Sequence, residues 1–111
     1  MHKFYYAISG LLTAFKHHSV KLQCILAILT CIAGVILQMD LIEWLFVLLC
    51  IGSVIALEIV NTCIEKLCDL ISIEKCNEIK EIKDMAASAV FVVSIVSLCI
   101  AILILFRHLG G

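Results

Sequence analysis

Three stretches without Asp, Glu, Lys or Arg limit what this chain can fold into more than any other feature. They cover residues 22–39, 44–57 and 85–106. A helix needs about 20 apolar residues to cross the roughly 30 Å hydrocarbon core of a bilayer, so the first and third stretches are long enough. The second is long enough only if its helix continues beyond Glu58 towards Glu65. The sequence therefore predicts three membrane-spanning helices.

The composition supports a membrane protein and excludes other classes. Hydrophobic residues make up 64% of the chain and charged residues 15%, far from the globular norm of roughly half and a quarter. The net charge of −1 at pH 7 argues against a nucleic-acid partner, whose phosphates require a basic patch. Cys24, Cys31, Cys50 and Cys99 lie inside apolar runs and no cysteines form a CxxC pair, so a disulfide scaffold or zinc site is disfavoured.

The N-terminal segment has a different pattern. Residues 3–18, "KFYYAISGLLTAFKHH", mix aromatic and aliphatic residues with basic ones, which favours an amphipathic helix lying in the membrane interface. A cleaved signal peptide is the alternative. We expect an all-α membrane protein, with one domain over residues 1–111. Its elements are the surface helix and three membrane helices at 22–39, 42–70 and 84–106.

The lysines predict the orientation of these helices. Lysines precede the first membrane helix and lie between the second and third, at Lys3, Lys16, Lys21, Lys66, Lys75, Lys80 and Lys83. The short connection near Asp40 and Glu43 has none. The positive-inside rule thus places the N-terminus in the cytoplasm, with Arg107 as a mild exception.

A polar stripe crosses the far half of the second membrane helix. At 100° per residue, Glu58, Asn61, Glu65 and Asp69 fall within an arc of about 80° on a helix. A charged residue at mid-bilayer costs roughly 2.5–3.5 kcal/mol on insertion scales, so such a stripe indicates a functional site. The alternative is structural, because polar side chains such as Asn61 also join membrane helices through hydrogen bonds.

The spacing of the stripe suggests a reaction at the membrane boundary. Glu58 and Glu65 are about 10 Å apart along the helix, so one can lie at headgroup depth while the other meets the cytosol. Glu65 and Asp69 can hold a magnesium ion together with phosphate oxygens. Glu58, desolvated, can act as a general base on a buried hydroxyl. Lys83 is a candidate for phosphate contact, whereas Asp84 also fits a simple role in the first turn of the third membrane helix.

Two sequence patterns carry a resemblance to a known family. They are Glu58-Ile-Val-Asn61-x3-Glu65-x3-Asp69 and Lys83-Asp84-Met-Ala-Ala-x-Ala-Val, and the similarity begins at Tyr6-x3-Gly10-Leu11. The chain resembles the bacterial integral-membrane diacylglycerol kinase family, including its undecaprenol kinase branch. The resemblance implies a homotrimer with active sites shared between subunits, at the cytoplasmic face of the bacterial inner membrane. It also implies Mg-ATP as donor and a lipid alcohol, diacylglycerol or undecaprenol, as acceptor, within phospholipid or cell-envelope lipid metabolism.

The same resemblance implies roles for individual residues. Glu58 would be the general base, with Asn61 shaping the lipid site, and Glu65 would ligate Mg²⁺ at the ATP phosphates. Residues expected to contact the nucleotide are Tyr6, Glu74, Lys75, Lys83 and Asp84.

One departure from the family pattern concerns the metal. The family has a second metal-associated glutamate after the surface helix, where this chain has His17 or His18, depending on a one-residue gap. His18 is retained as a candidate metal ligand, although magnesium prefers oxygen donors. Two other functions stay open: a membrane assembly protein of the same fold with impaired catalysis, and a small cation or proton pathway lined by Glu58 and Glu65.

Overall fold

The computed structural model describes residues 2–71 and 77–110, and within these residues it contains four helices and no strands. The helices are α1 (His2–Ala14), α2 (His18–Leu37), α3 (Leu41–Ile71) and α4 (Asn77–Leu109). The all-α prediction is confirmed.

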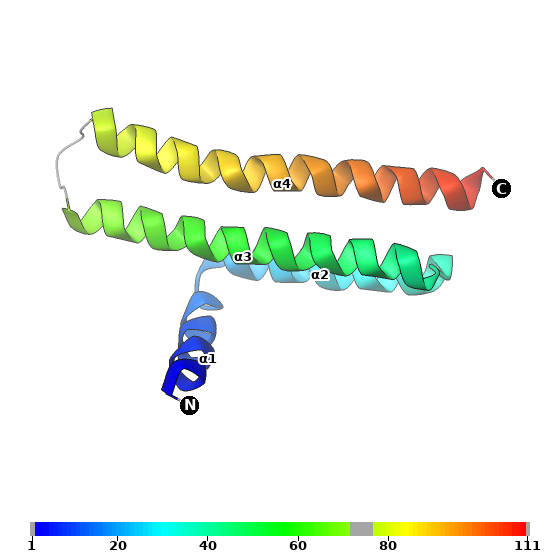
Figure 1. The fold of residues 1–111 in the computed structure, drawn as a ribbon, viewed down its shortest axis with the longest axis horizontal. Coiled ribbons are helices and arrows are strands. Elements are labelled where there is room, and N and C mark those ends of the chain that lie inside the picture. Colours follow the sequence, from blue (N-terminus) through cyan, green and yellow to red (C-terminus); the bar gives the residue numbers. More distant parts are fainter. Residues whose placement is uncertain (1, 72–76, 111) are drawn as a thin grey trace.

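The helices α2, α3 and α4 run along a common direction, whereas α1 lies across it (Figure 1). The long helices α3 and α4 are antiparallel neighbours. We call the end where α3 stops and α4 starts the loop end. The opposite end, with the α2–α3 turn and the C-terminal end of α4, is called the turn end.

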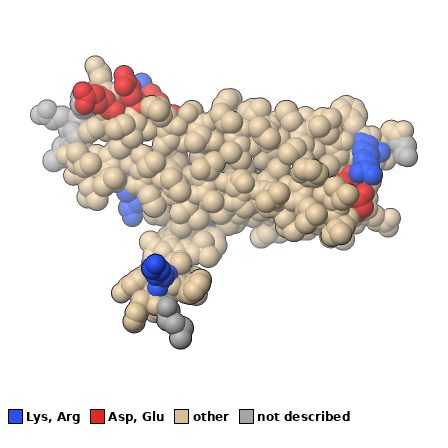
Figure 2. Space-filling model, in the orientation of Figure 1, with Lys and Arg blue, Asp and Glu red and all other residues tan. Residues whose placement is uncertain are grey.

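Three of the helices, α2, α3 and α4, are long and apolar enough to cross a membrane, as predicted. The 33-residue helix α4 contains no buried residue, and large apolar side chains such as Phe91 and Leu103 are more than half exposed. Figure 2 shows charged side chains at both ends of the helices and an uncharged middle. Such exposed apolar faces require lipid or another protein surface to cover them. The chain is an integral membrane protein.

The helices extend beyond several of the membrane segments drawn from the sequence. Helix α4 begins at Asn77, seven residues before the predicted membrane helix 84–106, because an α-helix continues readily from hydrocarbon into the polar interface. Helix α1 ends at Ala14, and the N–H groups of Lys16 and His17 bond to carbonyls three residues back. This tight turn lets α2 start in a new direction at His18.

The α2–α3 turn is built from a left-handed residue and a glycine. Gln38 has φ 57° and ψ 52°, and its N–H donates to the Val35 carbonyl at 3.1 Å. The N–H of Met39 donates to the Gly34 carbonyl at 3.1 Å, which completes a Schellman motif. A Cβ atom on Gly34 would lie 2.9 Å from Cη2 of Trp44 and would also meet the Met39 side chain. Gly34 therefore allows the two helices to approach closely at the turn.

We expect Gly34→Ala to destabilise the protein by about 1–3 kcal/mol, because the added methyl overpacks the turn against the rigid Trp44 ring. The matched control is Gly52→Ala in α3, where a Cβ atom meets nothing within 4 Å. That change should be neutral or stabilising by up to about 1 kcal/mol, since alanine favours the helix. Thermal unfolding in detergent micelles measures both. Equal effects of the two variants would contradict the close approach at Gly34.

Four charged or titratable side chains form a cluster at the turn end. Asp40 Oδ1 accepts the Glu43 N–H at 2.9 Å while Glu43 Oε1 accepts the Asp40 N–H at 3.1 Å, a reciprocal cap at the start of α3. The Glu43 residue is only 3% exposed. From α4, His108 Nε2 lies 2.8 Å from Glu43 Oε1, and Arg107 lies 3.5 Å from Glu43 Oε2 and 3.3 Å from Asp40 Oδ2. We call these four residues the turn-end cluster, and it gives Arg107 acidic partners at this end.

We expect Glu43→Gln to lower the midpoint temperature of unfolding more than Asp40→Asn. Glu43→Gln removes the buried Glu43 carboxylate, which contacts both His108 and Arg107. It leaves Arg107 without this partner, and unpaired charge in a buried place is unfavourable. Asp40→Asn keeps a good N-cap and loses only an exposed ion pair. Thermal unfolding at pH 7 compares the variants, and an equal or smaller effect of Glu43→Gln would show that the buried pair adds nothing.

Candidate active site

The predicted polar stripe lies on one unbroken helix, α3, which runs through it to Ile71. Its first two members are buried: Glu58 is 8% exposed and Asn61 is 7% exposed. Glu65 and Asp69, nearer the loop end, are exposed. The stripe thus passes from a buried part of α3 to the exposed residues near its end.

Asn61 connects the buried part of the stripe to the exposed part. Its Nδ2 donates a hydrogen bond to Glu65 Oε1 at 2.7 Å, one helical turn away. Its Oδ1 is buried, and among the described residues it has no hydrogen-bond partner. Asn61 therefore orients the Glu65 carboxylate and leaves an oxygen acceptor beside it.

Lys83 links α4 to the stripe. Its Nζ lies 2.9 Å from Asp69 Oδ1, and the lysine comes before the apolar run of α4 that spans the membrane. The hydrogen bond to Asp69 raises the pKa of Lys83 above its ordinary value, with Glu65 also contributing through its charge. Lys83 therefore places a positive charge beside Asp69 at the exposed end of the stripe. Among the described residues, each of the two exposed carboxylates has one partner, Asp69 the lysine and Glu65 the amide of Asn61.

Other candidate residues lie apart from this group. Asp84 Oδ2 pairs with Lys80 Nζ at 3.1 Å, one turn away on α4. Tyr6 is exposed on α1, where its ring meets the edge of Tyr5, and His18 is exposed at the first position of α2. Within residues 2–71 and 77–110, no hydrogen bond or ion pair joins Tyr6 or His18 to the stripe.

Two candidates, Glu74 and Lys75, lie outside the described residues. Among the residues that are described, no three His, Cys, Asp or Glu side chains form a group suited to a metal ion.

Sequence reasoning missed three of the contacts at this end. The bond from Asn61 to Glu65 and the pair between Lys80 and Asp84 both have the i, i+4 spacing at which side chains meet on a helix. That spacing was a usable signal. The pair between Lys83 and Asp69 had none, because it depends on how α3 and α4 align.

The fold and the stripe define a small helical membrane protein in which buried and exposed carboxylates, an amide and a lysine meet at one end of the spanning helices. Residues 5–105 match the family model of the prokaryotic diacylglycerol kinases, and the chain belongs to this family. The undecaprenol kinase of Bacillus subtilis (strain 168) is 34% identical to it over 97 residues, which are 87% of this chain and 79% of that protein. No solved structure matches the chain. The chain is therefore a membrane-embedded lipid kinase, an enzyme class that requires a nucleotide phosphoryl donor.

Proposed function

We propose that this kinase transfers the γ-phosphoryl group of Mg-ATP to the hydroxyl of a polyprenol, at the cytoplasmic face of the bacterial inner membrane. The observation that carries the proposal is the burial gradient along α3. Glu58 is buried, whereas Glu65, seven residues further on, is exposed. A single rigid helix therefore offers one carboxylate to a membrane-dissolved alcohol and another to a water-soluble donor, about 10 Å apart.

Glu58 is the proposed general base. Its carboxylate is buried within the helix bundle, where a membrane-dissolved lipid hydroxyl can reach it and donate its proton. The hydroxyl oxygen then attacks the γ-phosphorus in line. Catalysis of this transfer depends mainly on positioning and on stabilisation of charge.

The donor side of the site is Glu65 with Lys83. The Glu65 carboxylate and Asn61 Oδ1, which has no hydrogen-bond partner among the described residues, are hard oxygen donors that fit Mg²⁺. We assign the ion to them. His18 is a further candidate ligand. Bound Mg²⁺ would neutralise charge on the ATP phosphates. Lys83 offers a positive charge to the same phosphates once it exchanges its contact with Asp69. Further nucleotide contacts are proposed at Tyr6, Glu74, Lys75 and Asp84.

A homotrimer with shared sites is part of the proposal. Tyr6 and His18 make no described contact with Glu65 in one chain, and a neighbouring subunit can supply them. The exposed apolar faces of α4 also give subunits a surface to pack on.

The lysine distribution supports a cytoplasmic N-terminus and loop end. The one exception, Arg107, is paired with Asp40 and Glu43. Helix α1, lying across the spanning helices, is suited to the membrane interface (Figure 1).

The choice of polyprenol rests on the relative from Bacillus subtilis, which is named an undecaprenol kinase and aligns with most of this chain. The family's description names diacylglycerol instead. Both lipids present one neutral hydroxyl, so the assay below compares them directly.

Purified protein in mixed micelles with radiolabelled ATP should phosphorylate undecaprenol faster than diacylglycerol. Glu58→Gln should lower kcat by roughly a hundredfold or more, the usual effect of removing a general base. Glu78→Gln, the same change at an exposed glutamate in the first turn of α4, is the matched control and should keep the rate. Full activity of Glu58→Gln would rule out Glu58 as the base.

Intact protein that phosphorylates neither lipid would overturn the proposed function, and ion leakage from liposomes without ATP would support the cation pathway.

Asn61→Ala should raise the Mg²⁺ concentration needed for half-maximal rate by roughly ten- to a hundredfold, as expected when a group that orients a metal ligand is removed. Thr62→Ala is the control, because the Thr62 hydroxyl donates to the Glu58 carbonyl and its loss leaves the bond from Asn61 to Glu65 in place. Rates measured against free Mg²⁺ at saturating ATP test this. A slower Asn61→Ala enzyme with unchanged Mg²⁺ dependence would place Asn61 outside the metal site.

A further inference from the structure

The polar contacts between α3 and α4, within residues 2–71 and 77–110, lie at the two ends of these helices. At the loop end, Lys83 Nζ is 2.9 Å from Asp69 Oδ1. At the turn end, His108 Nε2 is 2.8 Å from Glu43 Oε1, and Arg107 lies 3.5 Å from Glu43 Oε2. His108 is about 38 Å from Lys83 along α4. The turn-end cluster therefore lies at the membrane face opposite the proposed donor site.

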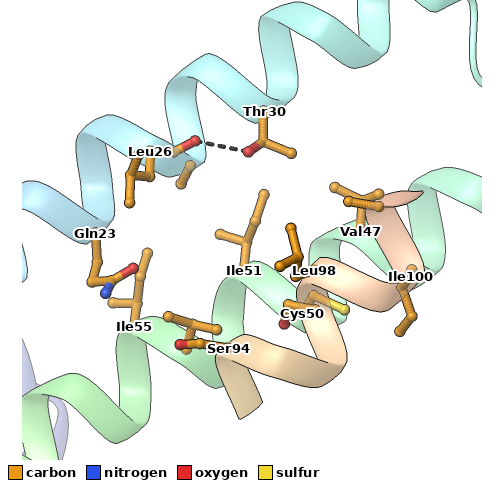
Figure 3. A pocket seen from close by; sticks show the side chains of 14 residues that line it. Gln23, Leu26, Thr30, Val47, Cys50, Ile51, Ile55, Ser94, Leu98 and Ile100 are labelled. Atoms are coloured by element: carbon orange, nitrogen blue, oxygen red, sulfur yellow. Dashed lines mark hydrogen bonds between the residues drawn. The ribbon is translucent and has the colours of Figure 1, made fainter. Parts of the chain in front are cut away.

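The middle of the bundle sets the axial position of α4 only weakly. A cavity of about 340 Å³ lies between α2, α3 and α4, and its lining has no charged side chain (Figure 3). It extends to Val47, one helical turn beyond Glu43, so it adjoins the turn-end cluster. Helix α4 contains no buried residue. Because apolar contact is not directional, the polar contacts at the two ends have the main part in holding α4 in its axial position.

Glu43 is the buried centre of the turn-end cluster, and Arg107 balances its charge only in part. The Glu43 side chain is 4% exposed, and its Oε2 has no hydrogen-bond partner among the described residues. The Arg107 guanidinium, 3.5 Å from this oxygen, also lies 3.3 Å from Asp40 Oδ2. One permanent positive charge thus serves two carboxylates. A protonated His108 supplies the second.

His108 is the group of this cluster that responds to mild changes of pH, because histidine changes its charge between about pH 5 and 8. Its side chain is 24% exposed, so water at this membrane face reaches the ring. The charged groups around it are Glu43 on α3, Asp40 at the α2–α3 turn and Arg107 on α4. Residues 22–39, which include most of α2, hold no charged side chain, and only their cysteine thiols titrate.

The direction of the response follows from the charges. Protonation of His108 makes its hydrogen bond to the Glu43 carboxylate a bond between opposite charges, which is shorter and stronger than one from a neutral ring. The turn end of α4 is therefore held most firmly at low pH and is released as the pH rises and the proton is lost.

We propose that His108 is a positioning residue for Lys83 and makes the kinase respond to the pH at the membrane face opposite its donor site. Protonated His108 holds the turn end of α4 against Glu43, and the continuous helix carries this position to Lys83 at the loop end. Loss of the proton loosens that hold, so Lys83 is placed less well for the phosphates. The inference rests on the proposed function, which assigns Lys83 to ATP.

Proteoliposomes that contain a polyprenol separate the two faces, because added ATP reaches only the copies whose donor side faces out. With the outer pH constant, KM for ATP should be roughly fivefold or more lower with the lumen at about pH 5.5 than at about pH 8, the lower end of the usual coupling between distant sites. KM for the polyprenol should not change, since Glu58 is held by α3. An ionophore that equalises the pH should abolish the difference. An active enzyme without this difference, or with equal changes in both KM values, would overturn the proposal.

Three variants identify the responding group. His108→Gln keeps a hydrogen-bond donor without a charge, and its KM for ATP should be high at both lumen pH values. His108→Lys supplies a permanent positive charge, and its KM should be low at both. His2→Gln, the same change at an exposed histidine of α1, is the matched control and should keep the response. A response that persists in His108→Gln would exclude His108 as its origin.

Distance measurements without ATP separate this coupling from catalysis. Nitroxide-bearing unnatural amino acids at exposed Leu70 of α3 and Glu81 of α4 report how the two helices pack at the loop end. In micelles their distance distribution should narrow between about pH 8 and about pH 5.5 when His108 is present, and stay broad in His108→Gln. This pattern in a protein that transfers no phosphate would overturn the proposed function and support the coupling. The same distribution at both pH values in an active kinase would overturn the coupling.

Discussion

Charge is unfavourable in the hydrocarbon layer, and α3 and α4 therefore make their polar contacts at opposite ends of the helix pair. At the loop end Lys83 pairs with Asp69, and at the turn end His108 contacts Glu43. The two acidic residues are about 39 Å apart along α3, and the two basic ones about 38 Å apart along α4. Because these lengths match, both pairs can form only in one axial register of the antiparallel helices. That register brings Lys83 beside the exposed end of the polar stripe.

The stripe places polar groups in a buried part of α3. Among the described residues Asn61 Oδ1 has no hydrogen-bond partner, and burial of such a polar atom is unfavourable. The proposed function accounts for this loss of stability, because a base that serves a membrane-dissolved lipid must reach into the apolar layer. The proposed donor-side residues, Glu65 and Lys83, are more exposed, and charged groups are solvated there at little cost.

The sequence alone was sufficient to predict the helices and the common face of the stripe, because both depend on local periodicity. Uncharged runs of about 20 residues have few folds open to them in a membrane, and the spacing of Glu58, Asn61 and Glu65 fixes a common face on any helix. Contacts between helices could not be predicted in this way. The Lys83–Asp69 pair and the turn-end cluster both depend on the register and spacing of α3 and α4, which no single segment encodes.

The end of α1 also depends on a local turn that the composition did not reveal. Apolar and basic residues continue to His18, but hydrogen bonds at Lys16 and His17 tighten the chain into a turn after Ala14. His18 consequently belongs to α2, in the first turn of a membrane helix. Its proposed place near a metal ion then depends on a neighbouring subunit.

The division of the site between two helices has a further consequence. Glu58 and Glu65 are separated by the rise of a single helix, so their distance persists as long as α3 is helical. The position of Lys83 instead depends on the packing of α4 against α3, and the turn-end cluster contributes to that packing from the far side of the membrane. Weakening the cluster should therefore disturb the position of Lys83, the proposed phosphate contact, more than the spacing of Glu58 and Glu65, which α3 alone sets. The proposed base and metal ligand are held at a fixed spacing by secondary structure, whereas the position of the lysine depends on tertiary structure.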